Sequence, residues 1–73
     1  MDESLARALL SELRNLTNSL NVLSKLSEGI ADDTDRKELR RSIATLMVEC
    51  DHQLIRPIER RYPQLEGIAV DKS

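Results

Sequence analysis

Residues 27–35, Ser27-Glu28-Gly29-Ile30-Ala31-Asp32-Asp33-Thr34-Asp35, interrupt a chain whose composition on both sides is typical of helices. Glycine readily adopts the left-handed conformation that commonly ends a helix, so we expect Gly29 to follow the first helix with a positive φ angle. Asp35 followed by Glu38 has the form of a capping box, which predicts that a second helix starts at Thr34 or Asp35. The stretch therefore predicts a turn, residues 29–34, between two antiparallel helices.

The first arm, about residues 3–28, carries leucines at alternating spacings of four and three. Asp2 or Ser4 can cap its N-terminus. At ~100° per residue, the leucines fall on one face of a helix, in the heptad pattern of a coiled coil. We therefore expect a single seam that consists of Leu5, Leu9, Leu13, Leu16, Leu20 and Leu23.

The second arm, about residues 35–62, carries a wider apolar surface. Its expected core row is Leu39, Ile43, Leu46, Met47, Cys50, Leu54 and Ile58. A second row beside it consists of Ala44, Val48, Ile55 and Tyr62. On the same helical plot the two rows span roughly 200°, whereas a surface helix buries a stripe of about 100°. We therefore expect this helix to have two neighbours, and a single hairpin to leave Val48, Ile55 and Tyr62 in water.

Two prolines divide the end of the chain. Pro57 lacks an N–H group, so we expect a kink near Arg56, with the apolar spacing continuing beyond it. Pro63 ends the helix, which makes residues 1–63 the helical hairpin and residues 64–73 a C-terminal tail. The tail is expected to fold back through Leu65, Ile68 and Val70, and its last few residues to be disordered.

Length and composition favour a small all-α domain that gains stability from a partner. The core of a chain of 73 residues rarely contributes more than ~3 to 5 kcal/mol to the free energy of unfolding. The lone Cys50 cannot add an intramolecular disulfide. With one tyrosine, no phenylalanine and no tryptophan, the core must be aliphatic. No apolar run approaches the ~18 residues of a membrane span, and the start of the chain does not look like a secretory signal, which predicts a cytoplasmic protein without membrane contact.

The sequence contains no catalytic or cofactor-binding motif, so we expect neither an enzyme nor a bound cofactor. Glu49 and His52 have the Glu-x-x-His spacing of metal-binding bundles, and Glu12 on the first arm could assist them. On the helical plot, however, His52 lies opposite the apolar row, so we expect solvated side chains and no metal. Cys50 occupies an apolar position and is expected to be a small buried hydrophobe.

Basic residues gather at both ends of the second arm, where they could contact phosphates. A net charge of −2 and a single aromatic residue speak against nucleic-acid binding. The candidate polyanion contacts are Arg36, Lys37, Arg40, Arg41, Arg56, Arg60 and Arg61.

The preferred interpretation is a non-enzymatic interaction or regulatory module, formed by two hairpins that dimerise into a four-helix bundle. Alternatives are a nucleic-acid-binding regulator and, least favoured, a metal-binding bundle. The orientation of the two hairpins stays open, as does closure of the bundle on a different protein. The expected core and dimer interface comprises Leu13, Leu16, Leu20, Leu46, Met47, Val48, Cys50, Leu54, Ile55, Ile58 and Tyr62.

Overall fold

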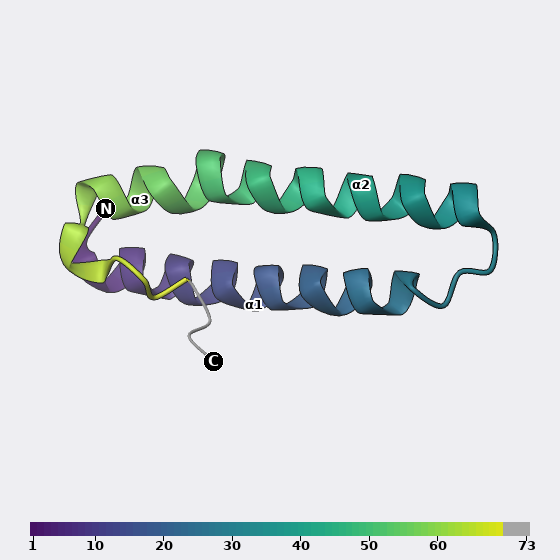
Figure 1. Ribbon diagram of the computed structural model, residues 1–73. Helices are drawn as coiled ribbons and strands as arrows, with labels where there is room; N and C mark the ends of the chain where they lie inside the picture. The colour runs from purple at the N-terminus through teal and green to yellow at the C-terminus, as the bar shows by residue number, and fades with distance from the viewer. Residues whose placement is uncertain (70–73) are drawn as a thin grey trace.

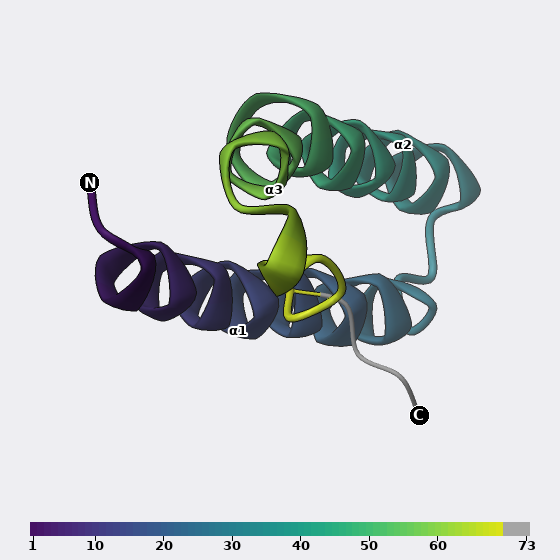
Figure 2. The same cartoon turned by 90° about the vertical axis from the view of Figure 1, so that its left-hand side faces the viewer.

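The computed structural model describes residues 1–69 and folds them into a helical hairpin (Figure 1). Helix α1 spans Glu3–Ser27 and α2 spans Asp33–Cys50. A π-helical turn, η1 (Asp51–Ile55), joins α2 to α3 (Arg56–Arg61), and a 3-10 turn, η2 (Pro63–Leu65), follows. Helices α2 and α3 run back along α1, so the N-terminus lies near the end of α3 (Figures 1 and 2). The predicted all-α class and hairpin arrangement are confirmed.

The turn differs from the prediction in both of its caps. Gly29 does not have a positive φ angle; within residues 1–69, Gly67 alone does, with φ of 92°. Helix α1 instead ends in tightened turns, in which the N–H of Gly29 donates to the Leu26 carbonyl at 3.0 Å. Helix α2 begins earlier than predicted because Asp32, rather than Thr34 or Asp35, is its N-cap: the Asp35 N–H donates to Asp32 Oδ1 at 2.9 Å.

The row of α1 that faces α2 and α3 shares only Leu13 and Leu20 with the predicted leucine seam. It keeps the alternating spacing of four and three but starts one residue later than Leu5. Small and hydroxyl residues occupy four of its seven positions. The Thr17 and Ser27 hydroxyls donate to carbonyls of the same helix, so these polar groups are hydrogen-bonded where the side chains are covered. The inward row, buried or half-buried throughout, consists of Ala6, Leu10, Leu13, Thr17, Leu20, Ser24 and Ser27.

The π turn changes which residues of the second arm face inward. The Arg56 N–H donates to the Asp51 carbonyl five residues earlier, so this turn holds one residue more than an α-turn. Ile55 thereby rotates to the inside, where it is 4% exposed, and Tyr62 is half-buried. The expectation that both lie in water in a single hairpin was wrong, because it assumed ~100° per residue throughout. Val48, before the π turn, is exposed as expected.

Pro57 lies directly after the π turn, in the first turn of α3. A proline in a regular helix clashes with the carbonyl four residues earlier, and it has no N–H to donate. The wider π turn accommodates the proline ring and the missing hydrogen bond. The helix therefore continues to Arg61.

The C-terminal segment closes the open end of the hairpin. Leu65 and Ala69 are buried in one cluster with Ala6, Leu10 and Ile55. Leu13, Ile58, Tyr62 and Ile68 pack around this cluster. Leu65 and Ile68 therefore fold back as expected, whereas Val70 and the last residues of the predicted tail lie outside the described residues.

Candidate interaction surface

Leucines on both arms of the hairpin are left without cover. Among the described residues, eight leucines are 39% to 70% exposed. On α1, each of them directly precedes a residue of the inward row, as Leu9 precedes Leu10. On the second arm, Leu46 precedes Met47 and Leu54 precedes Ile55 in the same way. We call this set the leucine face: Leu5, Leu9, Leu16, Leu23, Leu26, Leu39, Leu46 and Leu54.

The leucines of the two arms lie on the same side of the hairpin. A residue that precedes an inward residue is rotated from it by about 100° in a fixed sense. Two antiparallel helices are related by an approximate two-fold axis perpendicular to the plane that contains both. That rotation carries the outward side of one arm onto the same side of the other. The exposed leucines of α1 and of the second arm therefore lie on one side of the hairpin.

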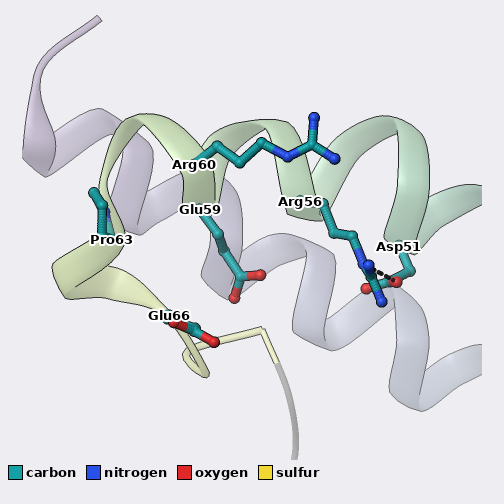
Figure 3. A pocket seen from close by; sticks show the side chains of 6 residues that line it. All are labelled: Asp51, Arg56, Glu59, Arg60, Pro63 and Glu66. Carbon is teal, nitrogen blue, oxygen red and sulfur yellow. Dashed lines mark hydrogen bonds and ion pairs between the residues drawn. The ribbon is translucent and has the colours of Figure 1, made fainter.

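The opposite side of the hairpin is polar, and the C-terminal segment folds over part of it. Residues that directly follow the inward rows lie there, and on α1 they include Arg7, Arg14 and Lys25. Near the open end this side contains an open hollow (Figure 3). It is lined by Asp51, Arg56, Glu59, Arg60, Pro63 and Glu66.

Asp51, Arg56 and Glu59 of this hollow have partners within the chain. Arg56 Nε lies 2.8 Å from Asp51 Oδ2, as the dashed line in Figure 3 shows. The Gly67 N–H donates to Glu59 Oε2 at 3.0 Å, which ties the C-terminal segment to α3. These two contacts therefore stabilise the open end of the hairpin.

The surface area of the chain indicates how large an uncovered face is. A compact monomer of 8.3 kDa exposes about 4,600 Å² by the usual scaling of area with mass. This chain exposes 5385 Å², which is roughly 800 Å² more. One partner in a standard protein interface buries about that area. The excess is therefore similar in size to the area that one partner buries in a standard interface.

The residues predicted for the core and interface divide between the inside of the hairpin and its surface. Leu13, Leu20, Met47, Cys50, Ile55, Ile58 and Tyr62 are buried or half-buried within one chain. Leu16, Leu46 and Leu54 belong to the leucine face, and Val48 is exposed on the opposite side. Leu5, Leu9, Leu23 and Leu39 belong to the rows predicted to face inward, and Leu26 belongs to neither predicted row, yet all five are exposed. The heptad spacing of Leu9, Leu16 and Leu23 is the signal that these residues share one face.

The basic residues of the second arm do not form one patch. At its start, Asp33 pairs with Arg36 and, at 3.0 Å, with Lys37. At its end, Arg56 and Arg60 line the hollow, whereas Arg61 continues the leucine row seven residues after Leu54. Arg40 and Arg41 are exposed. Nucleic-acid binding through these residues stays a prediction.

The predicted metal-ligand candidates do not form a group of three. His52 is exposed, and the Glu49 carboxylate accepts a hydrogen bond from Gln53 Nε2. Across residues 1–69, no group of three or more His, Cys, Asp or Glu side chains is placed to hold a metal ion. Cys50 is a free, half-buried thiol in the inward row of α2.

Comparison of the chain with protein-family models, with curated proteins and with solved structures gave no match. In the described part of the chain, no helix has both the length and the apolar character needed to span a bilayer.

Proposed function

We propose that the protein is a non-enzymatic interaction or regulatory module that acts as a homodimer, with the leucine faces of two hairpins packed together as a four-helix bundle. The leucine face is the observation that carries this proposal. Soluble monomers rarely expose a contiguous apolar patch above roughly 300 to 600 Å², because such a surface favours association. Both arms contribute to the face, as the two helices of each hairpin do in a four-helix bundle.

The size of the chain supports the same proposal. The buried cluster at the open end contains few large side chains, and Leu10 and Leu65 are the largest that are fully buried. A core of this size in a chain of 73 residues supplies only a few kcal/mol. Covering the leucine face with a second copy would extend the core along the whole length of the hairpin.

Dimerisation leaves the polar sides of the two hairpins on the outside of the bundle. Charged side chains such as Arg7, Lys25 and Lys37 would then be presented to solvent or to a further protein, as expected for an interaction module. The cytoplasmic location stays a prediction.

The test is the molar mass in solution, measured by light scattering over a range of concentrations. We expect twice 8.3 kDa at micromolar concentration. Leu16→Glu, in the middle of the leucine face, should shift the mass toward the monomer because it buries a charge at the contact. Asn21→Glu is the matched control, since it adds the same charge on the polar side of α1 and should leave the dimer intact.

Two results would contradict the proposal. One is a fully helical wild-type chain that stays at 8.3 kDa at low micromolar concentration. The other is a Leu16→Glu chain that remains as dimeric as the Asn21→Glu control, which would show that the leucine face is not the contact.

A further inference from the structure

We infer that the two copies pack with their turns at opposite ends, around a two-fold axis that passes between the two Leu16 side chains and the two Leu46 side chains. This inference rests on the proposed homodimer and adds the orientation of its subunits. A two-fold axis in the plane of the leucine face can run either across the helices or along them. The first choice places α1 against α1 of the other copy, and the second places α1 against α2 of the other copy.

The outward row of α1 is nearly the same when it is read in reverse. Its positions, 5, 9, 12, 16, 19, 23 and 26, lie within one residue of a symmetric arrangement about Leu16. Two antiparallel α1 helices would therefore set Leu5 against Leu26, Leu9 against Leu23, and Leu16 against itself. The two polar positions, Glu12 and Ser19, fall opposite each other, so the Ser19 hydroxyl can donate to the Glu12 carboxylate of the other copy. Listed in order, the row is Leu5, Leu9, Glu12, Leu16, Ser19, Leu23 and Leu26.

The outward row of the second arm has the same property. Leu46 lies seven residues after Leu39 and eight before Leu54, and the π turn takes up the extra residue. Two antiparallel copies of this arm therefore set Leu39 against Leu54, and Leu46 against itself. Arg61 continues the row beyond Leu54 and comes level with the acidic start of α2 in the other copy, residues 32–35. Opposite charges then meet at each end of the bundle.

A single axis serves both arms because their central leucines lie at the same level. Ile55 packs with both Ala6 and Leu10 at the open end of the hairpin. On α1, Leu16 lies ten residues after Ala6 and six residues after Leu10. On the second arm, Leu46 lies nine residues before Ile55, and the π turn lies within that interval. At 1.5 Å per residue these separations place Leu16 and Leu46 within about one turn of each other along the hairpin.

The arrangement with both turns at one end fits less well. Leu9, Leu16 and Leu23 would still meet leucines of the second arm, but Leu5 and Leu26 would have no leucine opposite them. The acidic residues of the two turns would also lie side by side, and like charges placed together disfavour the contact. These residues are Glu28, Asp32, Asp33 and Asp35.

The deciding experiment is a distance measurement between spin labels on Gly29→Cys in a Cys50→Ala background. The turn lies at one end of a molecule whose longest dimension is 46 Å (Figure 1). With turns at opposite ends, each label lies 13 residues from the axis, so the two labels should be about 40 Å apart at 1.5 Å per residue. With turns at one end, the helix spacing of 8 to 10 Å would bring them within roughly 20 Å. The short distance in a dimeric sample would overturn the inference and leave the dimer standing, whereas a monomeric mass would contradict the dimer itself.

Oxidative crosslinking gives a second, independent measurement in the same Cys50→Ala background. A disulfide requires Cα atoms within about 7 Å, so Leu16→Cys should crosslink with itself at the proposed axis. Leu9→Cys alone should not crosslink, but a mixture of Leu9→Cys with Leu23→Cys should. Crosslinking of Leu16→Cys with Leu46→Cys, with none of Leu16→Cys to itself, would overturn the inference.

Discussion

Leu65→Ala tests whether the C-terminal segment is part of the fold. Leu65 is fully buried, in a cluster with Ala6, Leu10, Ile55 and Ala69. The substitution removes three carbon atoms, which at ~0.8 kcal/mol each costs about 2.4 kcal/mol, and the cavity left behind raises the loss to roughly 3 to 4 kcal/mol. Because a core of this size supplies only ~3 to 5 kcal/mol, the variant should lose much of its stability.

The assay is a urea titration followed by circular dichroism, at one fixed chain concentration because dimer stability depends on concentration. With a slope of about 1 to 2 kcal/mol per molar urea, the midpoint should fall by roughly 2 M. Val22→Ala is the control, because Val22 is 55% exposed and its loss should change the free energy of unfolding by less than about 0.5 kcal/mol. A Leu65→Ala midpoint as close to wild type as the control would refute the packing of the C-terminal segment against α1.

Two further predictions concern the backbone. Gly67→Ala should destabilise the fold by about 1 kcal/mol or more because its φ of 92° strains an L-residue, whereas Gly29→Ala should be nearly neutral; equal urea midpoints would contradict this. In a Pro57→Ala background, deletion of Gln53 should be tolerated within about 1 kcal/mol because it only converts the π turn to an α-turn. Deletion of Thr45 should destabilise the fold more, since this deletion rotates the residues between position 45 and the π turn away from their present faces. Equal thermal stability of the two deletion variants would contradict the assignment of the extra residue to the π turn.

Local physical chemistry was enough to predict the helices and where the chain turns back. Asp2 caps α1 because its carboxylate accepts the Leu5 N–H at 2.7 Å, an interaction within four consecutive residues. Pro63 ends the helical part of the second arm because it directly restricts the residue before it. The return of Leu65 to the end of the hairpin also followed from the apolar character of that segment.

Tertiary packing alone decided which apolar residues face the other arm. A spacing of four and three is satisfied by the row that contains Leu9 and Leu16 and equally by the row that starts one residue later, with Leu10 and Thr17. Periodicity cannot choose between neighbouring rows, because each covers a similar arc of the helix. The second arm packs on the row with smaller side chains, and Leu9 and Leu16 are therefore left on the outside.

The π turn is the other feature that only the tertiary structure decided, although the spacing of apolar residues in the sequence is consistent with it. Met47 and Ile55 both face inward although they are eight residues apart, one more than a heptad. A helical plot with a constant angle of ~100° per residue sets such a pair about 80° apart, in neighbouring rows, which is why Ile55 was expected in water. Burial against Ala6 and Leu10 favours the turn that rotates Ile55 inward, and the contact that decides this comes from residues more than 40 positions away in the chain.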